Sequence, residues 1–303
     1  MNTQVTIAGV TFKNPVMTAS GTFGSGMEYS EFVDLNKLGA VVTKGVANVP
    51  WPGNPTPRVA EVYGGMLNAI GLQNPGIDVF LERDIPFLKQ YDTKIIVNVC
   101  GKTVEDYVEV VERLGEEPAV SMLEINVSCP NVKEGGHTFG QDPKVLFEVV
   151  SAVRAATKLP LFVKLAPNVP SIVPYVRACE DAGADALSLI NTIPAMVIDI
   201  ERRRPVIANG SGGLSGRAVH PVAVKVVHDA RAVTKLPILA MGGVYEAKDA
   251  VEFLLAGANA VAVGTALFSD PGVVAAVHDG IADYCARHGF ASVAALTAEG
   301  LQL

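Results

Sequence analysis

One cysteine lies in a setting that suits acid–base chemistry. Cys129 stands between two asparagines, Asn126 and Asn131, in the segment Asn-Val-Ser-Cys-Pro-Asn. A thiol can take a proton from a substrate when its pKa suits the working pH. The flanking amides could hold a polar, planar substrate, and the glycines that follow could act as hinges for closing over it. We therefore predict that Cys129 is a general base. The other cysteines are interpreted as small buried apolar side chains: Cys100, Cys179 and Cys285.

Two lysines end otherwise apolar runs. Lys44 closes the run 40–44, and Lys164 lies near the end of 160–165. A lysine is rarely buried without a partner, so each needs a role. Lys164 could be a Schiff-base nucleophile, as in a barrel aldolase or isomerase. It could equally be a fixed positive charge beside a cofactor, where a cation would stabilise an anionic reduced flavin. Spacing alone does not choose between these roles.

Short apolar runs alternate with stretches of helical spacing along most of the chain. The predicted strands are 15–19, 40–44, 94–99, 121–127, 160–165, 185–190, 237–241 and 259–263. The predicted helices are 104–114, 143–157, 170–182, 217–234, 246–256 and 272–287. Eight buried strands, each followed by a helix, predict an α/β fold of the (β/α)₈ barrel class in a single domain, 1–303. The longer connections 45–93 and 192–216 predict lids or a hairpin on the top face.

Polar groups or glycines are predicted at the carboxyl end of every strand. They are Ser20-Gly21, Lys44-Gly45, Asn98, Asn126, Lys164, Asn191-Thr192, Gly242-Gly243 and Gly264-Thr265. The chemistry of this fold takes place at those ends. Glycines after the last two strands let backbone N–H groups converge on a phosphate beside a helix start, so we predict a phosphate site there.

The bulk composition excludes several classes of function. The 303 residues are 49% hydrophobic and 18% charged, and the net charge of −7 argues against a nucleic-acid partner. The four cysteines form no CxxC pair, so no metal site is expected. No histidine falls at a predicted strand end, although His137 is near enough to Cys129 to be a helper. No apolar run approaches about 18 residues, and the start of the chain does not resemble a signal peptide. We therefore expect a cytoplasmic protein without a membrane span.

Three segments carry a resemblance to a known family. NVSCPN at 126–131, NAIGLQNPG at 68–76 and the early Ala19-Ser20-Gly21 resemble dihydroorotate dehydrogenases. The resemblance extends from about Val5 to Phe268. It implies FMN and the oxidation of dihydroorotate to orotate in pyrimidine synthesis, with Cys129 removing the proton from carbon 5 while hydride leaves carbon 6.

The same resemblance implies which residues bind the ligands. The implied substrate contacts are Lys44, Asn68, Ala69, Ile70, Gly71, Leu72, Asn126, Asn131, Asn191 and Thr192. The implied FMN contacts are Ala19, Ser20, Gly21, Lys44, Gly45, Asn98, Asn126, Lys164, Ile190, Gly216, Gly242, Gly243, Gly264 and Thr265. In this interpretation Lys44 lies between flavin and substrate, and Lys164 is the charge at the flavin.

The resemblance also narrows the subtype. The membrane-bound, quinone-using class has a serine base and an amino-terminal membrane helix, and we expect neither here. The segments 57–61 (PRVAE) and 132–136 (VKEGG) resemble the NAD-linked subtype, which works with a second subunit carrying FAD and a 2Fe-2S cluster. That implies a homodimer as the core of a heterotetramer. A fumarate-using homodimer is the alternative route for the electrons, and a flavin-binding protein without catalysis is a further rival.

Overall fold

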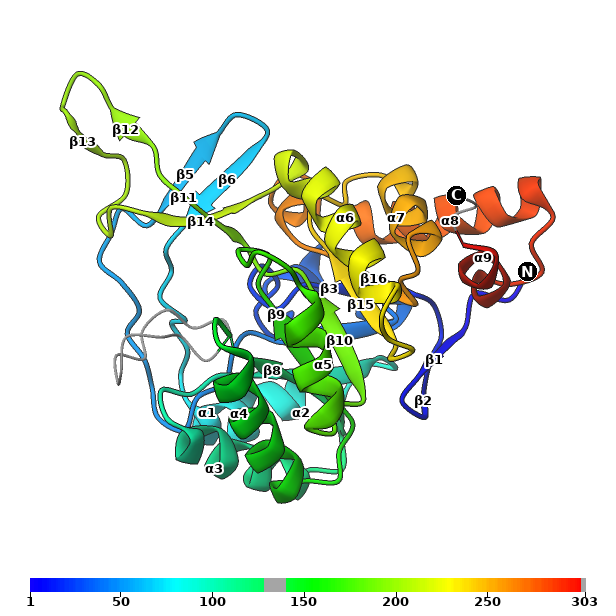
Figure 1. The fold of residues 1–303 in the computed structure, drawn as a ribbon, viewed down its shortest axis with the longest axis horizontal. Helices are drawn as coiled ribbons and strands as arrows, with labels where there is room; N and C mark the ends of the chain where they lie inside the picture. Colours follow the sequence, from blue (N-terminus) through cyan, green and yellow to red (C-terminus); the bar gives the residue numbers. More distant parts are fainter. Residues whose placement is uncertain (128–139, 301–303) are drawn as a thin grey trace.

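The protein is built around a closed barrel of eight parallel strands. The computed structural model describes residues 1–127 and 140–300 (Figure 1). Around the barrel the strands are β3 (Val16–Thr18), β4 (Ala40–Val42), β7 (Lys94–Val99), β8 (Val120–Asn126), β9 (Leu161–Leu165), β10 (Ala186–Leu189), β15 (Ile238–Met241) and β16 (Ala260–Val263). Pairing of β16 with β3 closes the ring. The predicted barrel and all eight predicted strands are confirmed, and no boundary is off by more than two residues.

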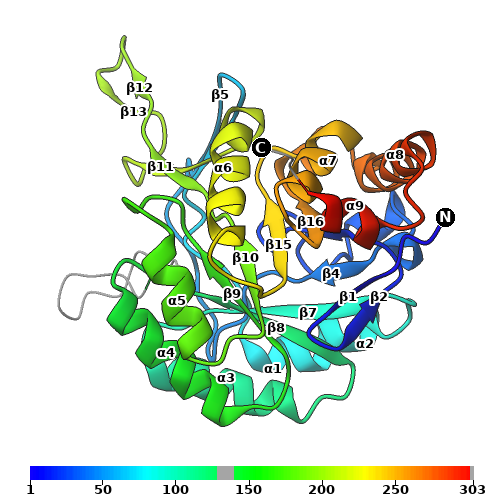
Figure 2. The same ribbon diagram turned by 45° about the vertical axis from the view of Figure 1, so that its right-hand side comes forward.

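Helices surround this barrel on the outside (Figure 2). They are α3 (Val104–Gly115), α4 (Pro143–Ala156), α5 (Val173–Asp181), α6 (His220–Arg231), α7 (Ala247–Leu255) and α8 (Val273–His288). Local chemistry sets their ends. Thr103 accepts the N–H of Asp106, whose carboxylate accepts the N–H of Thr103 in return, and this capping box starts α3. Pro143 occupies the first turn of α4, where no intrahelical donor is needed.

The long connections add a second sheet. Its order is β11 (Ile193–Ala195), β14 (Gly212–Ser215), β6 (Gly65–Asn68) and β5 (Val59–Val62), all antiparallel. Together with the hairpin of β12 (Ile198–Asp199) and β13 (Arg204–Pro205), it projects from the barrel at the upper left of Figure 1. The predicted hairpin is thus confirmed in each connection, as β5 with β6 and as β12 with β13, while the four-stranded sheet joins the two connections.

The expectation that a helix follows every strand is wrong for β3. Two short 3₁₀ turns, η1 (Tyr29–Glu31) and η2 (Leu35–Lys37), occupy that connection. After β4 the chain forms strands β5 and β6 of the outer sheet before α1 (Ile77–Val79), the π-helical turn η3 (Phe80–Asp84) and α2 (Ile85–Leu88).

Three further elements were not predicted: the strands β1 (Val5–Ile7) and β2 (Val10–Phe12), which form a hairpin, and the helix α9 (Val293–Glu299). Each is too short to give a clear hydrophobic period.

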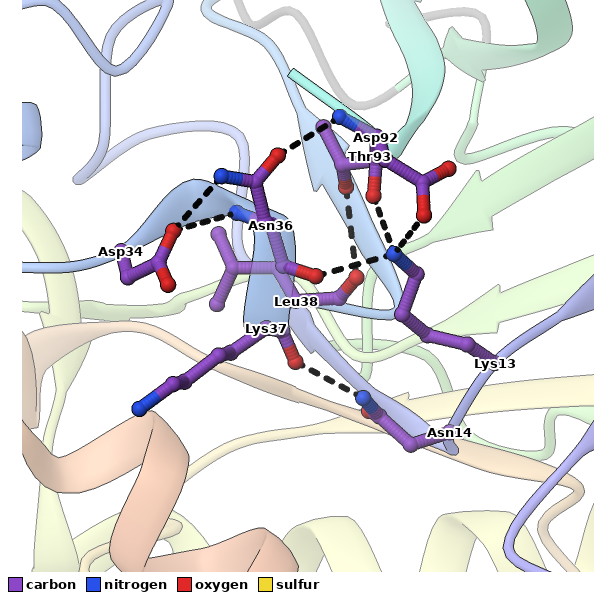
Figure 3. A network of polar contacts seen from close by, with 8 residues as sticks. All are labelled: Lys13, Asn14, Asp34, Asn36, Lys37, Leu38, Asp92 and Thr93. Carbon is purple, nitrogen blue, oxygen red and sulfur yellow. Dashed lines mark hydrogen bonds and ion pairs between the residues drawn. The ribbon is translucent and has the colours of Figure 1, made fainter.

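A polar network joins the amino ends of three barrel strands (Figure 3). The Lys13 ammonium, ahead of β3, donates to the Asn36 carbonyl at 2.9 Å and to the Asp92 carboxylate at 2.7 Å. It also donates to the Asp92 carbonyl. The Asn14 amide donates to the Lys37 carbonyl ahead of β4, and the Thr93 hydroxyl, ahead of β7, donates to the carbonyl of Leu38. These bonds hold the end of the barrel opposite the predicted site.

The strands themselves are buried on both faces, which is why they read as continuous apolar runs. Within them, six polar side chains are buried: Thr18, Asn98, Glu124, Asn126, Lys164 and Ser188. Among the helices of the described residues, none combines the length and the apolar character that crossing a membrane requires.

Candidate active site

A buried carboxylate lies at the centre of the polar side chains inside the barrel. Glu124 of β8 is fully buried and accepts hydrogen bonds from the Asn98 amide at 2.6 Å and the Ser188 hydroxyl at 2.5 Å. Ser188 lies on β10, two strands away from β8 in the ring, so its bond to Glu124 crosses the inside of the barrel. The Lys164 ammonium on β9 lies 3.7 Å from the same carboxylate and donates to the Ser20 hydroxyl at 3.3 Å. Lys164 is therefore buried beside an opposite charge.

Glu124 and Ser188 were not singled out from the sequence. Glu124 is a charged residue inside the apolar run 121–127, two positions before Asn126. Because side chains alternate along a strand, these two residues share a face. This spacing could have identified Glu124 as a site residue, because it places an acid on the same face as a predicted ligand-binding amide, one layer deeper in the barrel.

Positive charge gathers at the same end of the barrel. Burial lowers the pKa of Lys44, and the charges of Lys164 and Arg58 lower it further, while the thiol of Cys100 acts in the opposite direction. Cys100, Lys164 and Arg58 are therefore each close enough to act on Lys44. Cys100 is buried as predicted, but its place beside Lys44 was missed because only its apolar character was considered. A concentration of cations in a desolvated place favours an anionic ligand.

Two of the predicted substrate amides lie together. The Asn191 amide donates to the side-chain oxygen of Asn126 at 3.3 Å, and the Thr192 N–H donates to the side-chain oxygen of Asn191 at 2.8 Å. Asn126 ends β8, and Tyr107 of α3 anchors it by donating to its carbonyl at 2.8 Å. The chain thus presents planar donors and acceptors beside the buried charges.

A further group of predicted substrate residues comes from the outer sheet. Asn68 ends β6, and its amide donates to the Gly213 carbonyl at 3.3 Å. Ala69, Ile70, Gly71 and Leu72 follow. Gly71 has a φ of +73°, and a side chain there would meet the backbone N of Asn54 at 2.7 Å. The segment 68–72 is therefore held tightly against 53–54, and β6 connects it through β14 to β11, which follows Thr192.

Glycines form a backbone cradle where β15 and β16 end. Gly216, Gly242 and Gly243 have φ values of +104°, +127° and +72°. A side chain on Gly243 would lie 2.9 Å from the Gly216 carbonyl and 2.7 Å from His220 Cβ, so only glycine fits. Within the described part of the chain, Gly243 and Gly264 do not donate their N–H groups in any hydrogen bond. Free N–H groups near the start of α6 are what a phosphate requires.

His220 supports this cradle and was not among the predicted site residues. It is the first residue of α6, and its ring nitrogens lie 2.9 Å from the Gly242 carbonyl and 2.9 Å from the Glu252 carboxylate. It does not end a predicted strand, which is the criterion that excluded the histidines. The available signal was its place at the start of a predicted helix, four residues after Gly216. Nearby, the Thr265 hydroxyl bonds the Ser215 hydroxyl at 2.8 Å.

The remaining predicted cofactor residues also lie at this end. The Ala19 N–H donates to the Val263 carbonyl, and a side chain on Gly264 would lie 3.3 Å from Ala19 Cβ. Ile190 is buried and donates to the Met241 carbonyl. A side chain on Gly45 would come within 3.0 Å of the Asn98 amide oxygen, whereas one on Gly21 would meet nothing.

Two predicted residues cannot be placed in this geometry. The predicted base Cys129 and the amide Asn131 lie outside the described residues, as does the predicted helper His137. Their roles stay predictions.

The surface of the described residues is hollowed at either end of the barrel. One hollow, of about 440 Å³, lies at the amino ends of the strands beside Gly257 and Asn259. There the guanidinium of Arg231 donates to the carbonyls of Gly257, Thr234 and Leu236, which explains it as a structural side chain. A smaller hollow, of about 190 Å³, is lined by Gly65, Tyr245 and Thr265.

The fold is a barrel that brings cationic side chains and planar amides together at the carboxyl ends of its strands, an arrangement typical of a barrel enzyme and suited to an anionic ligand. A family model described as dihydroorotate dehydrogenase matches residues 2–284. The chain belongs to the dihydroorotate dehydrogenase family and is an oxidoreductase.

Relatives and a solved structure agree with this assignment. The chain is 61% identical over 293 residues to the dihydroorotate dehydrogenase B (NAD(+)) catalytic subunit of Lachnoclostridium phytofermentans, with 97% of each chain covered. It is 58% identical over 288 residues to the same subunit of Alkaliphilus metalliredigens, with 95% of each covered. The crystal structure of DHODH in complex with ferulenol from Eimeria tenella matches with a TM-score of 0.80 at 26% identity, over 96% of this chain and 86% of that one. The B-type resemblance predicted from 57–61 and 132–136 is confirmed.

Proposed function

We propose that the chain is the catalytic subunit of an NAD-linked dihydroorotate dehydrogenase, which oxidises dihydroorotate to orotate in pyrimidine biosynthesis. The observation that carries this proposal is the meeting of Lys44, Lys164 and the Asn126–Asn191 pair at one end of the barrel, in a chain 61% identical to such a subunit. Family membership contradicts the Schiff-base aldolase, and the B-type relatives disfavour the fumarate-using homodimer.

We further propose that the whole chain, 1–303, acts as one FMN-binding domain. The residues fit that cofactor in two respects: Gly243 and Gly264, at the glycine cradle, have N–H groups that could bind a phosphate, and Lys164 supplies a buried positive charge. Ser20, Gly45, Asn98, Gly264 and Thr265 end or follow the strands β3, β4, β7 and β16 on the same side of the barrel. When bound, FMN supplies the acceptor for the hydride that leaves carbon 6 of the substrate.

The chain's own residues then do the binding and the proton transfer. Asn126 and Asn191, with Asn68 and Asn131, would hold the amide and carboxylate groups of the substrate through planar donors and acceptors. Lys44 would offset the negative charge of the carboxylate. Cys129 would take the proton from carbon 5. This assignment of Cys129 rests on the resemblance of its segment to the family.

The relatives are named as catalytic subunits, which supports a second subunit for this chain as well. We propose that the partner carries FAD and a 2Fe-2S cluster, that two copies of each subunit form a heterotetramer around a homodimer, and that it works in the cytoplasm. Copurification of an iron–sulfur flavoprotein with the tagged chain is the expected result, and NAD should then accept the electrons. Recovery of the fully active chain with fumarate but not NAD would contradict this.

The test of the reaction is spectroscopic. The FMN-loaded chain should be yellow, and dihydroorotate added without oxygen should bleach the flavin absorbance. A yellow protein that dihydroorotate does not bleach would contradict the substrate, and a chain that takes up no FMN would contradict the cofactor.

A further inference from the structure

Glu124 is an acidic residue that has no role in the proposed reaction. It is fully buried, on the inner face of the barrel, between β7 and β9. Removing a carboxylate from water is costly unless hydrogen bonds and an opposite charge replace the lost hydration. Such a group needs an explanation beyond packing, because an apolar side chain would fill the same space at lower cost.

The contacts of the Glu124 carboxylate differ in length. Its shortest contacts are to neutral donors, the Asn98 amide at 2.6 Å and the Ser188 hydroxyl at 2.5 Å. The ammonium of Lys164 lies farther away, at 3.7 Å, and donates to the Ser20 hydroxyl at 3.3 Å. The carboxylate is thus held rigidly by its neutral partners. It acts on the ammonium mainly through its charge rather than by occupying the ammonium's hydrogen bonds.

Charges at this end of the barrel do act on one another. The positive charge of Lys164 contributes to lowering the pKa of Lys44, although burial is the larger cause. In so desolvated a place the field of a carboxylate reaches past its nearest neighbour, because little water screens it.

We propose that Glu124 is a positioning residue that holds Lys164 and offsets its charge, so that the pair, and not the lysine alone, sets the reduction potential of the bound flavin. This inference rests on the proposed function, since it requires FMN at the carboxyl ends of the strands. A cation beside the flavin stabilises the reduced, anionic form. A carboxylate behind that cation acts in the opposite direction and more weakly, because it lies farther from the flavin.

The experiment compares the affinities of the full-length chain for reduced and oxidised FMN by potentiometric titration. Glu124→Gln keeps the size of the side chain and removes its charge. We expect the ratio of reduced to oxidised affinity to rise about tenfold, which is about 30 mV in the two-electron midpoint. Lys164→Met should lower the ratio, and the double variant should lie between the two single variants. Ser188→Ala removes a hydrogen bond but no charge, and should leave the ratio within about twofold of wild type.

Several results would overturn the inference. An unchanged or lower ratio in Glu124→Gln would do so. Equal weakening of both FMN states, together with a lower Tm of the apoprotein, would show that Glu124 is merely structural. Should Glu124→Gln fail to fold, Glu124→Asp carries the test, because the shorter side chain draws the carboxylate back and should raise the ratio less. If the ratio of reduced to oxidised affinity does not rise in Glu124→Asp, the inference is also overturned. A wild-type chain that binds no FMN would overturn the proposed function as well, whereas FMN binding with an unchanged ratio overturns this inference alone.

Discussion

At the carboxyl ends of the strands, Lys164 and Glu124 lie 3.7 Å apart with side chains that are 8% and 0% exposed; at the amino ends, Lys13 and Asp92 lie 2.7 Å apart with side chains that are 33% and 92% exposed. The pair with the shorter distance is the exposed one. An exposed ion pair contributes little to the free energy of unfolding, because solvent and salt screen the attraction between its charges. The buried pair interacts more strongly at a greater distance, and each charge depends on the other.

The two ends also differ in what the charges bond. Lys13 donates hydrogen bonds to two backbone carbonyls and to the Asp92 carboxylate. These bonds connect the starts of β3, β4 and β7 (Figure 3). Lys164 and Glu124 instead bond side chains that other strands contribute, and they lie next to the predicted ligand residues. Barrels divide their stability and their chemistry between the two ends in this way. Substitutions at the two ends should therefore have separable effects.

The largest effect is expected at Cys129, on the segment after β8. Cys129→Ala should slow reduction of the flavin by dihydroorotate by roughly 10²–10⁴-fold, the usual contribution of a general base. The Tm should hardly change. Stopped-flow measurement of flavin bleaching tests this prediction. Cys129→Ser should keep part of the rate with an optimum at higher pH, because a hydroxyl is the poorer base. An alanine variant within a few-fold of wild type would remove Cys129 from the role.

The comparison of the two lysines is tested by a matched pair of substitutions. Lys164→Met leaves Glu124 buried without its cation and should cost about 3 kcal/mol in the free energy of unfolding. Lys13→Met should cost no more than about 1 kcal/mol in the same free energy, since its pair is in water. Denaturant unfolding of the apoproteins, free of any ligand effect, gives both values. Equal losses at the two positions would contradict the distinction between the ends.

Two glycines with similar backbone conformations provide the next comparison. Gly243 in the cradle has a φ of +72°, and Gly289 at the end of α8 has a φ of +76°. Alanine at Gly289 meets nothing within 4 Å, so it should cost only about 1 kcal/mol of backbone strain. Alanine at Gly243 meets His220 Cβ and the Gly216 carbonyl, and should also weaken FMN binding by about tenfold or more as the N–H groups shift. Fluorescence titration of FMN would measure this, and similar FMN affinities for the two variants would argue against the cradle.

The sequence predicted the carboxyl end better than the amino end. Strand periodicity and the polar residues at strand ends were enough to bring Lys44, Lys164, Asn126 and Asn191 together, because a parallel barrel gathers those ends. Glu124 was missed because neither of its partners is local in sequence. Asn98 is its register partner on the adjacent strand β7, 26 residues away, and Ser188 lies 64 residues away on β10 and reaches it across the inside of the barrel. No local pattern encodes that contact.

The amino end was not predicted for a different reason. The hairpin of β1 and β2 has strands of three residues each, which is too few for a period to be recognised. The Lys13 network depends on carbonyls of Asn36 and Asp92, and a backbone acceptor leaves no trace in residue type.

The sheet of β5, β6, β11 and β14 was predicted only as a hairpin, since its pairing joins segments about 145 residues apart.

The smallest effect concerns the pH dependence of the exposed pair. The hydrogen bond from Lys13 and then its charge lower the pKa of Asp92 below the ordinary value of 3.8. A lowered pKa in the folded state stabilises the protein above the unfolded pKa, and that contribution disappears as the pH falls through the folded pKa. The Tm difference between wild type and Lys13→Met should therefore be the same at pH 7 and at about pH 5.5, and should narrow below about pH 4. It should not vanish, because the bond from Lys13 to the Asn36 carbonyl does not titrate. In an Asp92→Asn background the narrowing should be absent, and a difference that is constant down to pH 3 in the native background would show that Asp92 contributes nothing.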